Sequence, residues 1–97
     1  MMKATEARAR MEKALADKEA KVTRYAENIA DWVCEVVIKY AVDEGKSGTY
    51  FTDPELHNHF SYLEMTGISR ALEMLKELGY EVEEEYSIKG NIYRLAW

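Results

Sequence analysis

The side chains best suited to metal binding or acid–base chemistry lie in one short segment. Asp53, Glu55, His57 and His59 alternate along the chain, and a metal site needs three or four such ligands to converge. They could converge only if the segment were not helical. Asp53 followed by Pro54 is typical of a helix N-cap and first turn, and residues two apart on a helix point to different sides. We therefore predict no metal site, and a solvated helix with one histidine against an aromatic ring.

The single cysteine, Cys34, is the candidate nucleophile. A reactive thiol needs a histidine and an electropositive setting, but Cys34 lies in an apolar run between Val33 and Glu35. We interpret it as a buried structural thiol. One cysteine cannot form an intramolecular disulfide, and the first twenty residues lack a signal-peptide-like apolar run. Both features indicate a cytoplasmic protein.

Two other motifs with chemical potential have simpler interpretations. Gly45-Lys46-Ser47 is similar to the end of a phosphate-binding loop, but that loop needs an earlier glycine where this chain has Tyr40. Residues 83–85 are three glutamates that we expect on a strand, where neighbours alternate faces and acid resists edge pairing. No serine, lysine or carboxylate pair has catalytic spacing. We predict a protein that is not an enzyme and uses no cofactor.

The longest element that the sequence predicts is an N-terminal helix. No glycine or proline interrupts the chain from Thr5 to about Val42. The helix is polar up to Lys21 and densely apolar from Val22 onward, with an apolar residue every seventh position from Leu15 to Val36. We expect the first half to extend from the domain or to pair with another chain. The predicted oligomer interface comprises Leu15, Val22, Tyr25, Ile29 and Trp32.

The remaining chain predicts a small sheet with helices on one of its faces. We expect a strand at 49–52, a helix from Asp53 to the break at Thr66-Gly67, a helix that Ser69 caps and Gly79 ends, and a hairpin over 80–97. The hairpin should present Tyr80, Val82, Tyr86 and Ile88 on one face. The fold class is α+β, with a long N-terminal helix followed by β-α-α-β-β and a three-stranded sheet. Residues 1–97 form one domain, with a polar helical extension over 1–21 and a packed body over 22–97.

Composition restricts the partners. The net charge of −5 disfavours non-specific binding to nucleic acid, which depends on neutralising phosphates. No stretch approaches the ~20 apolar residues of a membrane span, so we expect no membrane association. The many aromatic residues either pack the core or, with nearby cations, hold a nucleotide. The predicted ligand-binding residues are Arg24, Tyr50, Phe51, Arg70, Tyr93 and Arg94.

The segment from Met65 to Arg70, followed by an apolar helix, Gly79 and a hairpin, resembles a winged-helix DNA-binding domain. The expected order of helices and strands is also that of the family. The resemblance implies a dimeric regulator with Ser69, Arg70, Glu73 and Lys76 facing the major groove and Lys89 at the tip of the wing. Acidic residues on both elements depart from the pattern: Glu73, Glu77, Glu81, Glu83, Glu84 and Glu85.

The whole chain also resembles a loose group of small bacteriophage accessory proteins. The resemblance lies in the start Ala4-Thr5-Glu6-Ala7-Arg8, in Leu78-Gly79-Tyr80-Glu81-Val82 before a hairpin, and in the closing Trp97. It implies a viral protein of the host cytoplasm that antagonises host defence by blocking a host protein or sequestering a nucleotide immune signal. We therefore expect a non-catalytic, homo-oligomeric binding protein. The alternatives are a winged-helix regulator and a small structural or assembly protein.

Overall fold

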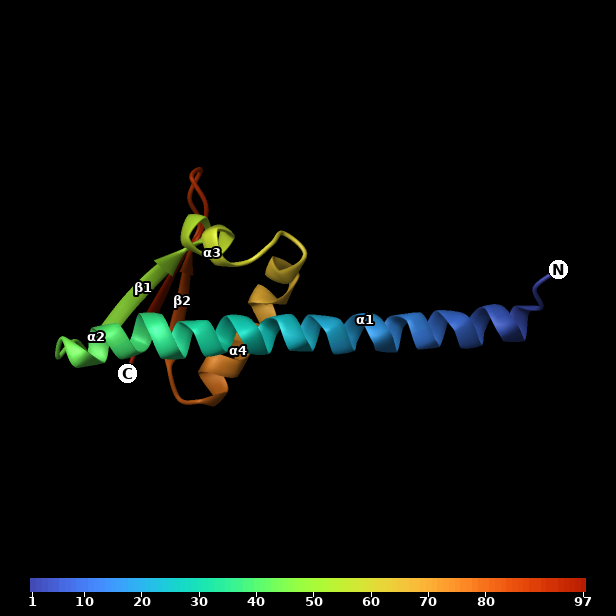
Figure 1. Cartoon of the computed structure of the whole chain (residues 1–97), viewed down its shortest axis with the longest axis horizontal. Coiled ribbons are helices and arrows are strands. Elements are labelled where there is room, and N and C mark those ends of the chain that lie inside the picture. Colours follow the sequence, from blue (N-terminus) through green and yellow to red (C-terminus); the bar gives the residue numbers. More distant parts are fainter.

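The computed structural model describes residues 1–97, and one straight helix runs through nearly half of them. It comprises α1 (Ala4–Trp32), the π-helix η1 (Val33–Ile38) and α2 (Lys39–Asp43). The residues at both junctions keep right-handed helical dihedral angles, so the three pieces are continuous (Figure 1). The prediction of one long helix is confirmed. The N-terminal half projects past the rest of the chain, which gives the molecule dimensions of 63 × 29 × 20 Å.

The π-helix changes which side chains the long helix buries. The inward positions step from Ile29 to Val33 and then to Ile38, because a π turn holds one residue more than an α turn. The seven-residue repeat therefore fails at its last member. Val36 is 51% exposed and does not belong to the core-facing stripe that the repeat predicted.

The sheet has the predicted composition and its helices on one face. It contains β1 (Gly48–Thr52), β2 (Glu81–Glu85) and β3 (Ile92–Ala96), with β3 in the centre and antiparallel to both neighbours. Phe51 on β1 is paired with Tyr93 on β3, and both side chains face the helices. The core lies between this face and the long helix. Its buried residues include Ala26, Ile29, Val33, Leu56, Ala71, Leu72, Leu75 and Leu95.

The helix α3 (Asp53–His59) is shorter than predicted and has a different cap. Phe60 adopts extended dihedral angles, so the chain leaves the helix before Leu63, which is 64% exposed. Thr52 is the N-cap residue, and its Oγ1 accepts a hydrogen bond from the Glu55 amide. Asp53, the expected cap, binds across to β3 instead.

The 3-10 turn η2 (Glu64–Gly67) leads directly into α4 (Ile68–Glu77), which packs on α1 (Figure 1). Ser69 was expected to cap α4, but the helix continues from η2 without a side-chain cap. Gly79 ends the turn after α4 with a φ of +100°, as its position predicted. The tip of the β2–β3 hairpin projects beyond the core, on the side of the molecule away from α1 (Figure 1).

Candidate functional site

The two histidines of α3 contact different aromatic rings. The His59 ring lies 4.9 Å from that of Trp32, and the His57 ring lies 4.7 Å from that of Tyr62. Asp53 faces neither histidine, because its carboxylate accepts hydrogen bonds from Tyr93 and from the Asn91 amide. No group of three or more His, Cys, Asp or Glu side chains is placed to hold a metal ion.

Cys34 lies on η1, half-buried beside the core. Burial raises the pKa of its thiol, and the carboxylates of Asp31 and Glu35 raise it further. Nucleophilic cysteines need the opposite setting, in which positive charge favours the thiolate. The environment of Cys34 therefore supports a packing role for this side chain.

Two of the six predicted ligand-binding residues belong to the core. The Phe51 side chain is fully buried, and that of Tyr93 is 4% exposed. Their rings stack on each other with centroids 5.0 Å apart, while the Tyr93 hydroxyl donates a 2.6 Å hydrogen bond to Asp53 Oδ1. Neither ring has a free face for a ligand, so the predicted role is wrong for these two residues.

Tyr50 and Arg94 are brought together on the outer face of the sheet. They are direct cross-strand partners on β1 and β3, and both are exposed. The Arg94 guanidinium is already engaged by the Glu85 carboxylate, at 2.9 Å from Nη2 and 3.3 Å from Nε. Glu83 is the cross-strand partner of Arg94 on the other side. An anionic ligand at Tyr50 would therefore meet two carboxylates as well as one cation.

The other two predicted ligand-binding cations lie on the helices. Arg24 is exposed on α1, and Arg70 borders a shallow groove with Leu15, Glu19 and Val22 where α4 meets α1. Both are remote in the fold from the outer face of the sheet. The predicted set therefore does not converge on one ligand site within a single copy.

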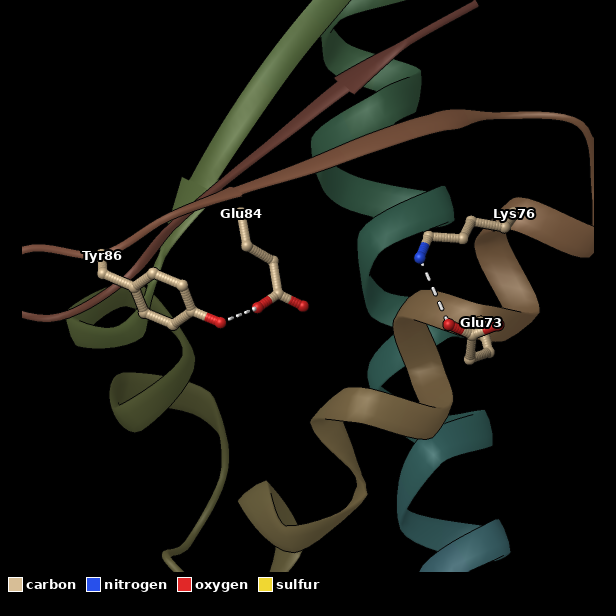
Figure 2. Close-up of polar contacts among 4 residues, drawn as sticks. All are labelled: Glu73, Lys76, Glu84 and Tyr86. Carbon is tan, nitrogen blue, oxygen red and sulfur yellow. Dashed lines mark hydrogen bonds and ion pairs between the residues drawn. The ribbon is translucent and has the colours of Figure 1, made fainter.

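A second candidate surface lies on the hairpin and α4, and we call it the hairpin–α4 face. In Figure 2, Glu84 and Tyr86 project from the hairpin on the side where α4 lies. The Tyr86 hydroxyl donates to Glu84 at 3.3 Å, and Lys76 on α4 forms a 3.2 Å ion pair with Glu73. These contacts reduce the positive charge that the face can offer. Ser69, Arg70 and Glu77 lie beside Glu73 around a shallow pocket on α4.

The tip of the hairpin carries exposed apolar groups that the core does not cover. Tyr86 is 78% exposed and Ile88 is fully exposed, and alternation predicted both on the apolar face of the hairpin. The strand β2 ends at Glu85, and the core does not extend below the two residues. In the sequence, Tyr86 and Ile88 look like core residues. Their exposure becomes clear only from the structure, which shows where the helices stop covering the hairpin.

A third candidate surface is the projecting part of α1, residues 4–21, which we call the arm. Every residue of the arm is exposed, including Met11 at 54% and Leu15 at 51%. The residues of the predicted oligomer interface differ in exposure on the two sides of the end of the arm. Leu15 is exposed and Val22 and Tyr25 are half-buried, whereas Ile29 is fully buried within its own body.

Trp32 is half-buried and packs against the body. Its ring makes edge contacts with Phe51 and Phe60, at centroid distances of 6.3 and 6.0 Å. Leu63 borders a groove beside the end of the arm and is 64% exposed. Sequence reasoning missed Leu63, because it placed this residue on the apolar face of a longer helix.

Comparison with known proteins gives no relative: no protein-family model matches this chain, and neither does any curated protein or solved structure. None of its helices has the length and apolar character that crossing a membrane requires. The geometry of the three surfaces is therefore the basis for assigning a role.

Proposed function

We propose that this chain is a non-catalytic binding protein that works as a homo-oligomer and blocks a partner protein. The proposal keeps the class suggested by the resemblance to bacteriophage accessory proteins, in which the partner is a host defence protein in the host cytoplasm. Of the two modes of action implied there, protein blocking has more support than sequestration of a nucleotide signal.

The exposed hairpin tip is the observation that carries this proposal. Tyr86 and Ile88 stand at 78% and 106% relative exposure on a hairpin that projects from the body (Figure 1). Exposing a tyrosine and an isoleucine together gives a folded chain no stability, whereas aromatic side chains dominate protein-binding hot spots. Lys89 adds one charge beside them, so the tip combines an apolar anchor with a polar rim.

Nucleotide sequestration has weaker support because the residues expected to bind it are dispersed. Phe51 and Tyr93 are buried, Tyr50 and Arg94 lie on the outer face of the sheet, and Arg24 lies on α1. A nucleotide site needs a base-stacking ring and a phosphate-binding cation within one pocket. These residues could form a nucleotide site only if two copies of the chain each contributed part of it.

The second candidate function is a winged-helix DNA-binding regulator, and the order of the helices and strands favours it. The order helix, strand, helix, helix and two-stranded hairpin along the chain is the order that the resemblance implied. Charge opposes it, because Glu73 pairs with Lys76 on α4 and four glutamates lie on β2. Phosphate binding requires unpaired cations on such a face.

The test of protein blocking compares two matched double variants. Tyr86→Ala with Ile88→Ala removes the hairpin tip, while Tyr40→Ala with Val42→Ala removes an exposed pair of similar type on α2. A bacterial protein that co-purifies with the chain would be purified and the complex rebuilt from its two components. We expect the tip variant to weaken the dissociation constant at least tenfold and the α2 variant to leave it unchanged. Equal effects of the two variants, or no complex from purified components, would contradict the proposal.

The test of DNA binding is a duplex titration at low and moderate salt. A regulator should bind with an affinity that falls as salt rises, and Arg70→Ala and Lys89→Ala should each weaken it. Failure to bind random or genomic duplexes at low salt would remove this candidate. Retention of a nucleotide by the purified chain would instead support sequestration.

A further inference from the structure

The core-facing stripe of α1 continues past the body along the arm. Ile29 is fully buried, and Val22 and Leu15 lie seven and fourteen residues before it, on the same side of the helix. Met11 lies one turn before Leu15. Val22 is half-buried, but Leu15 and Met11 remain 51% and 54% exposed. A single copy of the chain therefore leaves part of this stripe uncovered.

The uncovered stripe ends at the body in two shallow grooves, one on each side of Val22. Glu19 and Arg70 border the first groove, and Tyr25, Leu63 and Lys21 border the second. A helix that followed the stripe toward the body would end between these walls. There it would contact Leu63, which is 64% exposed.

The charges of the arm and the body are opposite in sign. Residues 1–21 carry six Lys or Arg and four Asp or Glu side chains, whereas residues 22–97 carry seven and fourteen. Opposite charge favours contact between arm and body. The arm cannot reach its own body because α1 is straight and projects away from it (Figure 1). The arm of a second copy can reach it.

We infer that a second copy of this chain covers the stripe, with the two arms antiparallel. This inference rests on the homo-oligomer of the proposed function and adds its geometry. An arm of 18 residues is about 27 Å long, and an isolated helix of that length is marginal in water. Pairing along the stripe supplies the apolar contact that each arm lacks.

Lys18 lies seven residues before Tyr25, on the stripe side of the arm. Lys18 and the position of the bodies distinguish the two directions of pairing. Parallel arms in register would place Lys18 against the same residue of the second copy, and would bring two acidic bodies to one end. Antiparallel arms place the bodies at opposite ends and direct each basic arm toward the acidic body of the other copy. Charge therefore favours the antiparallel arrangement.

Cysteine cross-linking of the full chain tests the direction, in a Cys34→Ala background. Ala7 and Ala14 are both exposed on the stripe side of the arm, seven residues apart. If the two-fold axis passes near residue 13, the two copies of position 14 are offset by about 3 Å along the arms and those of position 7 by about 18 Å. A disulfide needs Cα atoms about 4.4–6.8 Å apart. We expect Ala14→Cys to form a covalent dimer on mild oxidation, and Ala7→Cys to form none.

Ala16→Cys is the matched control, because position 16 is exposed on the opposite side of the arm. It should not cross-link. Cross-linking at both position 7 and position 14 would show parallel arms and overturn the inference. A dimer in native mass spectrometry without a cross-link at position 14 would also overturn it, while leaving the proposed oligomer intact. A monomer without cross-links would contradict the oligomer itself.

Discussion

Gly67 lies against the backbone of Ala26 so closely that a Cβ atom on Gly67 would come within 2.6 Å of the Ala26 amide nitrogen. The same atom would lie 3.0 Å from the carbonyl carbon of Tyr25. This contact fixes where η2 crosses α1 and therefore where the body ends and the arm begins. The absence of a side chain at residue 67 thus allows η2 to cross α1 at Ala26.

Gly67→Ala should destabilise the fold by about 1–3 kcal/mol, because the methyl group meets backbone atoms that cannot move aside without separating the two helices. Urea denaturation followed by circular dichroism measures the change. Ser69→Ala is the control, since Ser69 is exposed two residues away and its loss should change the free energy of unfolding by less than about 0.5 kcal/mol. Equal stability of Gly67→Ala and the unmodified chain would contradict the close crossing.

Val33 and Val36 test the π turn as a matched pair. Val33 is fully buried and Val36 is 51% exposed. Val33→Ala should cost about 2 kcal/mol through lost burial and a residual cavity, whereas Val36→Ala should cost less than about 0.5 kcal/mol. Thermal or urea unfolding of the two variants measures both losses of stability. The opposite ranking would show that the regular seven-residue repeat, and not the π turn, sets the buried face.

Tyr93→Phe should lower the free energy of unfolding by about 2 kcal/mol near neutral pH, because it removes the 2.6 Å hydrogen bond to the Asp53 carboxylate. Asp53 would keep its bond from the Asn91 amide. Urea unfolding at pH 7 measures the loss. Tyr62→Phe provides the control, since Tyr62 is 83% exposed.

The buried hydroxyl of Tyr93 should also make the stability of the fold depend on pH. Burial and the Asp53 carboxylate raise the pKa of Tyr93 above its ordinary value of about 10. The resulting stabilisation is fully present below pH ~10 and is lost above it, as the tyrosine of the unfolded chain ionises. Urea midpoints measured between pH 8 and pH 11 should therefore fall less in Tyr93→Phe than in the unmodified chain. If the urea midpoints of both chains fell equally with pH, the raised pKa of Tyr93 would be contradicted.

Most of the fold was predictable because local chemistry and periodicity agree. The long helix follows from its freedom from glycine and proline, and the hairpin follows from Gly90 between two β-prone runs. The predictions of the fold that were wrong concern features that depend on tertiary contacts. The π turn at Val33–Ile38 has no residue signature, and Asp53 became a partner of Tyr93, forty residues away, instead of capping its own helix.

The candidate site was less predictable than the fold. Aromatic residues look alike in sequence whether they pack or protrude, so Phe51 and Tyr93 were expected to bind a ligand although they are buried. Tyr86 and Ile88 were predicted on one apolar face of the hairpin, but alternation does not show how far the core extends beneath a strand. Exposure is set by which helices cover the sheet, and a single sequence does not specify that.

Native mass spectrometry of the full chain at modest salt tests the central claim most directly, because it reports subunit number and retained ligand together. A non-catalytic oligomer that blocks a protein should appear as a dimer with no added mass. Leu15→Glu should convert it to a monomer, because the substitution places charge on the exposed stripe of the arm. A monomer at every concentration tested would contradict the oligomer. A dimer that carries additional mass in the nucleotide range would contradict protein blocking in favour of sequestration.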